Sequence, residues 1–294
     1  MEAALAVAPW RMVGGYDLPG DYLMALDEAL LESVIAGGMP VVRFYTWRPA
    51  TLSLGVNQPV GEIQPDECAR RGFTLVRRLT GGRAVLHQHE LTYSVIAREN
   101  DPRVSGGVIE SYRKISAALV DGLCSLGVDV SLAEPSRALY RAMSASRRQA
   151  DAGSDTGGEG SHGAVCFDTA SAYEITASGR KLVGSAQARR GGAILQHGSI
   201  LLDIDWDAWV SVFSYATEEG KQRAYTKLPS RMTSLKHEFG RVVAPEEVQQ
   251  ALVRGFERNL KVELIPSLPS EAEEAHAQQL LREKYSTEAW TNKT

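Results

Sequence analysis

The sequence has few cysteines, no marked excess of charge of either sign and no long apolar run. Its three cysteines, Cys68, Cys124 and Cys166, are an odd number without the close spacing of metal ligands. Neither a disulfide framework nor a structural zinc site is therefore expected. Free thiols are typical of a reducing compartment, so we expect a cytoplasmic protein.

The charge balance also gives no reason to expect nucleic acid or an anionic membrane as a partner. The 294 residues include 32 basic and 36 acidic side chains, a net charge of -4, whereas phosphate-binding surfaces carry a basic excess. No apolar run approaches the roughly 20 residues that cross a bilayer. Residues 1–10 lack the basic start and apolar stretch of a signal peptide. We expect no nucleic-acid partner and no membrane partner.

What the sequence does contain is enough apolar residues, 44%, to bury a sizeable core. Segments typical of strands are grouped, with helical segments before and after them. This grouping predicts an α+β fold with a mixed, largely antiparallel sheet and packed helices. We expect a single domain over 1–294 with its core at about 20–265, a flexible insertion at 144–163 and a C-terminal helical extension at 270–290.

Local patterns predict the individual elements. Apolar residues recur at helical spacing in 20–36 and 109–126. β-branched and aromatic residues predict strands on both sides of Pro49 and a hairpin that turns at Ser178-Gly179. Residues 144–163 are too poor in large apolar side chains to offset the entropy of ordering. Ser270 and Glu273 have the spacing of a capping box for the last helix.

The first segment with chemical potential runs from Arg77 to His87 and reads Arg-Arg-Leu-Thr-Gly-Gly-Arg-Ala-Val-Leu-His. Two glycines beside basic residues suit a ligand that approaches the backbone closely. The alternatives are that the arginines are ordinary solvated charges, and that His87 is a core or loop histidine, a general base or, with His89, a metal ligand. No Cys, Asp or third His completes a metal site with these two histidines, so no metal is expected. The candidate substrate-binding residues of this segment are Arg78, Gly81, Gly82, Arg83 and His87.

The second segment offers a thiol and an amine. Cys166-Phe167-Asp168 precedes a predicted hairpin that carries Lys181. A free thiol is only a few per cent ionised at neutral pH, and a nearby ammonium lowers its pKa by roughly one to several units. The same ammonium can stabilise the oxyanion of a tetrahedral intermediate. Cys166 and Lys181 are therefore candidate catalytic residues, while a buried structural thiol is the interpretation for Cys68 and Cys124 and the alternative for Cys166.

Together the two segments resemble the biotin/lipoate protein ligase catalytic-domain family, from about Leu23 to the C-terminal helix. Two motifs are similar to those of the octanoyltransferases that begin lipoate synthesis in bacteria. One is the first segment followed by Glu90-Leu91-Thr92-Tyr93-Ser94, and the other is Gly-Arg-Lys-Leu-Val-Gly-Ser-Ala-Gln. In those relatives a cysteine carries the acyl group, and a lysine fifteen residues later lowers its pKa. Cys166 and Lys181 have that separation. The resemblance further implies that the substrate site includes Tyr93, Gly184, Ser185 and Ala186.

The resemblance implies a two-step acyl transfer. Cys166 would take octanoyl from acyl carrier protein as a thioester. A lysine on a lipoyl domain, such as that of the glycine-cleavage H protein, would then take it as an amide. No cofactor is implied, and a monomer is expected. Because a carrier protein is acidic, basic residues around Arg77, Arg78 and Arg83, or Arg189-Arg190, are candidates for docking it.

Three other interpretations stay open. ATP-dependent lipoate-protein ligases resemble the chain but typically have Arg-Asn-Asp where it has Cys166-Phe167-Asp168. The amidotransferase that moves octanoyl from H protein to other lipoyl domains also uses a cysteine. A silent member would only bind lipoyl domains, but it would be expected to lose the thiol or the lysine. Two departures from the octanoyltransferases are Ala172, where relatives often have Trp, and the insertion at 144–163.

Overall fold

The computed structural model describes residues 5–133 and 174–293. The strands of its large sheet are β1 (Ala8–Leu18), β2 (Val41–Trp47), β6 (Glu90–Arg98), β7 (Val130–Leu132), β8 (Ile175–Ala177), β9 (Arg180–Arg190), β10 (Ala193–Leu201) and β11 (Val262–Pro266). The strands of its small sheet are β3 (Thr51–Leu54), β4 (Thr74–Arg77) and β5 (Val85–His87). The helices are α1 (Gly20–Ile35), η1 (Val60–Glu62), α2 (Pro65–Arg70), α3 (Val108–Ser125), α5 (Trp206–Ser211), α6 (Glu218–Arg231), α7 (Leu235–Phe239), α8 (Pro245–Leu260), α9 (Glu271–Leu280), η2 (Leu281–Tyr285) and α10 (Glu288–Thr291).

The large sheet is mixed and mostly antiparallel. Among the described residues its strand order is β11-β1-β2-β6-β10-β9-β8-β7, and that of the small sheet is β4-β3-β5. β1 pairs in parallel with both β11 and β2, whereas the pairs from β2 to β7 are antiparallel. The α+β fold with a mixed, largely antiparallel sheet that the sequence predicts is therefore confirmed.

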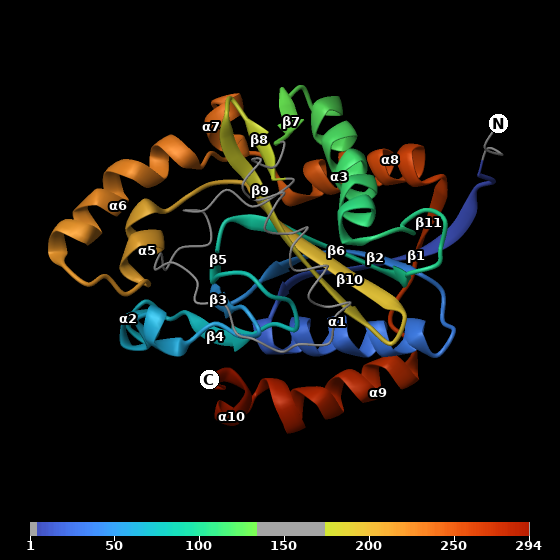
Figure 1. Ribbon diagram of the computed structural model, residues 1–294, viewed down its shortest axis with the longest axis horizontal. Helices are drawn as coiled ribbons and strands as arrows, with labels where there is room; N and C mark the ends of the chain where they lie inside the picture. Colours follow the sequence, from blue (N-terminus) through green and yellow to red (C-terminus); the bar gives the residue numbers. More distant parts are fainter. Residues whose placement is uncertain (1–4, 134–173, 294) are drawn as a thin grey trace, which may run out of the picture.

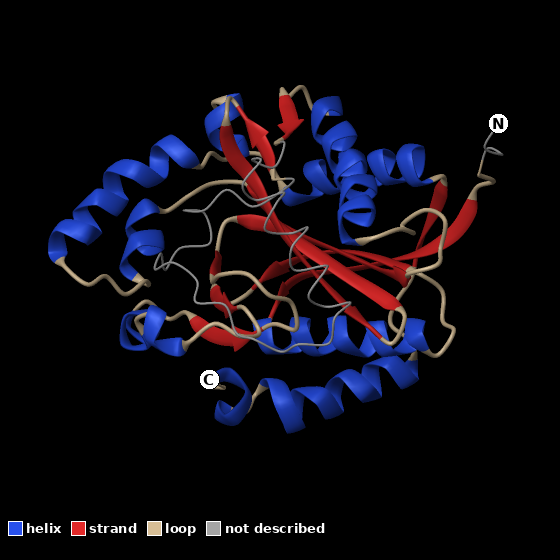
Figure 2. Ribbon diagram, in the orientation of Figure 1, coloured by secondary structure: helices blue, strands red, loops and turns tan. Residues whose placement is uncertain are grey.

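Helices cover both faces of the large sheet. Figure 1 shows α1 below the sheet with α9 beneath it, and α3 with α8 above the sheet; Figure 2 shows the same layers by type of element. On the face under α3 and α8, the sheet residues Phe44 and Tyr93 pack against Phe256 of α8. The two helices meet at Gly255, where an added Cβ would lie 2.2 Å from the carbonyl oxygen of Ala118. Glycine is needed at this crossing because any side chain would force the helices apart.

Several local predictions are confirmed. The helices predicted at 20–36 and 109–126 are α1 and α3, and the strands on either side of Pro49 are β2 and β3. These two strands belong to different sheets, so the chain passes from the large sheet to the small one at this point. The hairpin turns at Ser178 and Gly179, whose φ angles are 50° and 71°, as a two-residue type I′ turn requires.

The C-terminal helices begin at the predicted capping box. The Glu273 N–H donates to Ser270 Oγ at 3.2 Å, and the Ser270 N–H donates to Glu273 Oε2 at 2.7 Å. β1 and β11 were not predicted. The predicted insertion at 144–163 lies outside the described residues. None of the helices described combines the length and the apolar character that a membrane span requires.

Candidate active site

A cavity of about 260 Å³ lies where the large sheet, the small sheet and α1 meet. Both predicted segments reach it, one through the chain that follows β4 and the other through β9. Met24 of α1 and Trp47 of β2 complete the wall. The predicted site residues that the structure brings together here are Arg78, Gly82, Arg83, His87, Lys181, Gly184, Ser185 and Ala186.

The two glycines of the first segment have different roles. An added Cβ at Gly81 would meet no atom within 4 Å, and Gly81 is not part of the cavity wall. Gly82 has a φ of 88°, a conformation that side chains disfavour. An added Cβ on Gly55 would lie 1.9 Å from the carbonyl oxygen of Gly82. The close backbone approach at these glycines is therefore between two segments of this chain.

Arg78 is buried, and its guanidinium holds the surrounding loop. Nη1 donates to the carbonyl oxygen and Oγ of Ser53 at 2.9 and 3.1 Å, and Nε donates to Thr80 Oγ at 3.1 Å. Nη2 donates to the carbonyl oxygens of Gly81 and Arg83 at 2.8 and 2.7 Å. A fork of five donors suits such a cluster of acceptors. Arg78 thus shapes one wall of the cavity while most of its donors act within the protein.

Arg77 differs from the expectation for a ligand groove or a docking surface. It is fully buried, lies outside the cavity wall, and donates to the carbonyl oxygens of Gly55, Gln58 and Thr291 at 2.7, 2.7 and 2.8 Å. The next residue, Arg78, lines the cavity. The two adjacent side chains therefore point in opposite directions, as in extended backbone with its two-residue period. Arg77 joins the C-terminal segment to the loop after β3.

His87 lies between a hydroxyl and a carboxylate. Its Nε2 is 2.9 Å from Ser53 Oγ, its Nδ1 is 3.3 Å from Glu90 Oε1, and its ring stacks on Trp47 with centroids 3.9 Å apart. Burial lowers the pKa of His87, and Glu90 only partly offsets this effect. Ser53 and Glu90 thus occupy both ring nitrogens of His87 and fix the orientation of the ring.

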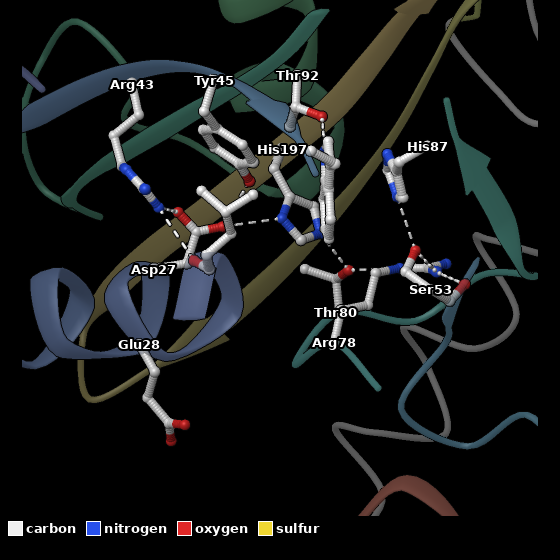
Figure 3. Close-up of polar contacts among 12 residues, drawn as sticks. Asp27, Glu28, Arg43, Tyr45, Ser53, Arg78, Thr80, His87, Thr92 and His197 are labelled. Carbon is white, nitrogen blue, oxygen red and sulfur yellow. Dashed lines mark hydrogen bonds and ion pairs between the residues drawn. The ribbon is translucent and has the colours of Figure 1, made fainter. Parts of the chain in front are cut away.

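His197, which also lines the cavity, likewise lies between a hydroxyl and a carboxylate. Its Nε2 is 2.7 Å from Thr80 Oγ and its Nδ1 is 3.2 Å from Asp27 Oδ2. Asp27 also accepts hydrogen bonds from Arg43 and, at 3.0 Å, from the Tyr45 hydroxyl. Burial alone would raise the pKa of Asp27, but the Arg43 guanidinium and His197 lower it. Figure 3 shows Asp27 between Arg43 and His197, with Thr80 and Arg78 leading on to Ser53 and His87.

Lys181 is buried at the beginning of β9 and lines the cavity. It forms an ion pair with Glu174, and its carbonyl oxygen accepts a hydrogen bond from the Thr233 N–H at 2.9 Å. Cys166 lies outside the described residues, as do Ala172 and the rest of its segment. The predicted pairing of Cys166 with Lys181 therefore stays a prediction.

Gly184, Ser185 and Ala186 follow Lys181 along β9, and Gly198 lies opposite Ser185 on β10. The Tyr93 hydroxyl donates to Ser185 Oγ at 2.8 Å, and burial raises the pKa of Tyr93 to about 12. Tyr93 itself lies behind the wall, in the core. An added Cβ on Gly198 would lie 2.5 Å from Ser185 Oγ and 2.7 Å from Tyr93 Cε1. This glycine makes room for the Tyr93–Ser185 contact.

Sequence reasoning missed the residues that support the wall from other segments. Asp27 lies four residues after Leu23 on the apolar stripe of α1 and is buried. A carboxylate on a buried stripe needs a cationic or hydrogen-bonding partner, and this signal could have identified it. Ser53 and Thr92 carried no such local signal. Across residues 5–133 and 174–293, no three His, Cys, Asp or Glu side chains are grouped so that they could hold a metal ion.

Comparison with known proteins decides the family. A model of the lipoyl protein ligase A/B catalytic domain matches residues 19–257. The chain belongs to this family. It is 40% identical to octanoyltransferase LipM of Geobacillus kaustophilus, over 98% of this chain and 100% of that protein. It is also 40% identical to octanoyltransferase LipM of Staphylococcus aureus, over 96% of this chain and 97% of that protein.

Solved structures of lipoate-protein ligases share the fold. A bipartite lipoate protein ligase from Thermoplasma acidophilum has a TM-score of 0.77 at 25% identity, covering 97% of this chain and 96% of that one. A lipoate-protein ligase A bound with ATP has a TM-score of 0.76 at 26% identity, covering 97% of this chain and 98% of that one. The expected membership of the lipoate-protein ligase family is thus confirmed.

Proposed function

We propose that this protein is an octanoyltransferase, an acyltransferase of lipoate biosynthesis that moves octanoyl from an acyl-carrier donor to a lipoyl-domain lysine. The observation that supports this proposal most directly is the position of Lys181, whose ammonium is buried in the wall of the small cavity. Cavities that hold drug-sized ligands measure roughly 300–1,000 Å³, so about 260 Å³ suits a short chain. Relatives that match nearly the whole chain and are named octanoyltransferase support the same reaction.

Cys166 is the proposed nucleophile. Its thiolate attacks the thioester carbonyl of the donor, the carrier thiol leaves, and octanoyl is held as an enzyme thioester. The acceptor amine then attacks this thioester, an amide forms, and the Cys166 sulfur leaves and receives a proton from the amine. Lys181 lowers the pKa of the thiol and stabilises the oxyanion of each tetrahedral intermediate. Neither step consumes ATP, and no cofactor is proposed.

The proposed partners are octanoyl-acyl carrier protein as donor and the glycine-cleavage H protein, or another lipoyl domain, as acceptor. The other proposals concern the chain as a whole: one catalytic domain that works as a cytoplasmic monomer. Its substrate contacts come from Arg78, Gly81, Gly82, Arg83, His87 and Gly184 to Ala186, and Tyr93 supports Ser185 from behind the cavity wall.

The docking surface for an acidic donor is better placed on α6 than on the arginines that the sequence suggested. Arg189 and Arg190 lie at the end of β9 opposite to Lys181, and they pair with Glu99 and Glu28 at 3.3 and 2.9 Å. Figure 1 shows α6 as the outermost helix on the side of α5. The chain returns from α6 directly to Lys181, because the next residues, Met232 and Thr233, pair with it.

Among the exposed cations of α6, Arg223 and Lys227 lie one helical turn apart. Neither of these two forms an ion pair with another residue that the structure describes. Unpaired basic side chains on one helix face attract an acidic surface and steer its approach. We therefore place the donor on α6, with its acyl arm directed at the cavity.

The test is the mass of the intact protein after incubation with octanoyl-acyl carrier protein without ATP, followed by addition of H protein. Wild type is expected to gain one octanoyl group that hydroxylamine removes and that H protein accepts. Cys166→Ala should gain none, whereas the control Cys124→Ala should behave as wild type. Modification of H protein only with free octanoate and ATP would show a ligase instead. Loading only from octanoyl-H protein would show the amidotransferase.

A further inference from the structure

Arg78 lies at the junction of two hydrogen-bonded chains of side chains that end at two different carboxylates. One chain runs from Arg78 through Thr80 and His197 to Asp27. The other runs from Arg78 through Ser53 and His87 to Glu90. Each chain has the same order of groups: guanidinium, hydroxyl, imidazole, carboxylate. We call them the Thr80 relay and the Ser53 relay.

The direction of every hydrogen bond in the relays follows from Arg78. A guanidinium can only donate, so Thr80 Oγ accepts from Nε at 3.1 Å and Ser53 Oγ accepts from Nη1 at 3.1 Å. Each hydroxyl has one proton of its own, which it donates to the imidazole Nε2 beside it. Each Nε2 is then an acceptor without a proton. The proton of each neutral ring must lie on Nδ1, which donates to Asp27 or Glu90.

The other protonation states leave groups unsatisfied. An Nε2–H tautomer would turn the Nδ1 lone pair of His197 toward the Asp27 carboxylate, so that two acceptors face each other. A protonated ring would donate to Thr80 Oγ, and the proton of that hydroxyl would lose its acceptor. The same holds for His87 and Ser53. Among the described residues, Asp27 and Glu90 face the imidazoles, Arg78 lies across the hydroxyls and Arg43 lies behind Asp27. Arg83 and Lys181 line the same cavity.

We propose that Arg78 is a positioning residue that fixes both cavity histidines, His87 and His197, as neutral Nδ1–H tautomers with no ring N–H pointing into the cavity. His87 and His197 both line the cavity, and Arg78 acts on them only through Ser53 and Thr80. The two rings then form uncharged walls. For the acyl transfer this role rests on the proposed function, because an uncharged wall suits an octanoyl chain.

The structural test is a long-range ¹H–¹⁵N correlation spectrum of the full chain with ¹⁵N-labelled histidine. His87 and His197 are expected to show a protonated Nδ1 and an unprotonated Nε2, the tautomer that free histidine disfavours. Thr80→Val should change the pattern of His197 alone, Ser53→Ala that of His87 alone, and Arg78→Lys both. Thr80→Ser keeps the hydroxyl and should restore the wild-type pattern. His276, which pairs with Glu32 on the surface, is the internal reference.

The relays are overturned if either ring of the wild type is protonated on Nε2, or if Thr80→Val leaves His197 unchanged. A Thr80→Val variant that does not fold leaves the wild-type spectrum and Thr80→Ser as the deciding measurements. Thr80→Val leaves Nε2 of His197, in the cavity wall, without its hydrogen-bond donor. In octanoyl transfer this variant is expected to raise KM for the octanoyl donor about tenfold, with kcat nearly unchanged. The expected spectrum without any octanoyl transfer by wild type would overturn the proposed function and leave the relays standing.

Discussion

Glu174 and Lys181 form an ion pair in the wall of the cavity. The two residues are only 9% and 5% exposed, so both charges are largely removed from water. A buried ammonium without its carboxylate is unfavourable by several kcal/mol. Glu174 thus keeps the Lys181 ammonium in place at the point where the proposed chemistry needs a positive charge.

Replacing Glu174 with Gln is expected to slow the loading of octanoyl by about 10- to 100-fold, since a hydrogen bond to a charged group contributes roughly 1.5–3 kcal/mol. The rate is followed by the mass of the intact protein at a series of pH values. Glu174→Asp should recover part of the rate because it keeps the charge. Glu263→Gln, at an exposed position on β11, is the matched control. A wild-type rate for Glu174→Gln would contradict a role for the ion pair.

Gly81 and Gly82 are adjacent but should respond differently to alanine. Gly82 has a φ of 88°, so Gly82→Ala is expected to lower the free energy of unfolding by about 1–2 kcal/mol. Gly81 has open space at its Cβ, so Gly81→Ala should stay within about 0.5 kcal/mol of wild type. Urea unfolding measures both values. Slower transfer by the stable Gly81→Ala protein would support substrate contact at Gly81, and equal destabilisation by the two changes would contradict the structural distinction.

The parts of the fold that the sequence predicts are those decided by neighbours in the chain. The helical period of α1, the positive φ angles at Ser178-Gly179 and the Ser270–Glu273 capping box all depend on residues a few positions apart. β1 and β11 depend on each other although some 250 residues separate them. β1 contains Gly14-Gly15 and β11 ends at Pro266, both of which are unfavourable in strands. Only the packing of the whole sheet makes these segments strands.

The candidate site divides in the same way. Residues within the two motifs, such as Arg78 and Lys181, were identified because the chemistry lies in a continuous stretch. Their supporting groups come from elsewhere: Asp27 from α1, Ser53 from β3 and His197 from β10. These side chains meet only after the small sheet packs against the large one. Arg77 and Arg78 have the same side chain and opposite environments, and which of them faces the cavity depends on the register of β4.

Arg77 should be among the residues on which stability depends most. Its guanidinium donates to carbonyl oxygens of the loop after β3 and of Trp290 and Thr291, and the Trp290 indole N–H donates to the Arg77 carbonyl oxygen at 2.9 Å. Arg77→Met leaves these buried acceptors without donors, so we expect a loss of about 3–5 kcal/mol in the free energy of unfolding. Arg77→Lys should recover little of this because it lacks the planar fork. A loss below 1 kcal/mol in urea unfolding would contradict this role.

Reversing the charge of Arg223 and Lys227 tests the proposed docking surface on α6. The double change to Glu is expected to raise KM for octanoyl-acyl carrier protein on the order of tenfold at low salt, within the range that charge steering provides. The effect should shrink as salt is added. With octanoyl-pantetheine, which lacks the acidic protein, the double variant should have the same KM as wild type. Arg254→Glu, an exposed change on α8, is the control, and an equal effect of this variant would argue against a localised surface.

The ion pair between Glu273 and Arg11 predicts how stability changes with acid. Burial alone would raise the pKa of Glu273, but hydrogen bonds from Arg11, from the Ser270 N–H and from Ser33 lower it from 4.5 to about 2. Because the folded state binds this proton less readily than the unfolded state, the contribution is complete above about pH 4.5 and is lost as the pH falls toward 2. Glu273→Gln keeps the capping-box geometry and removes only the charge. Urea unfolding should therefore find this variant less stable than wild type at pH 6, with the difference shrinking below pH 4.5, whereas a difference independent of pH would show that the charge of Glu273 is not its cause.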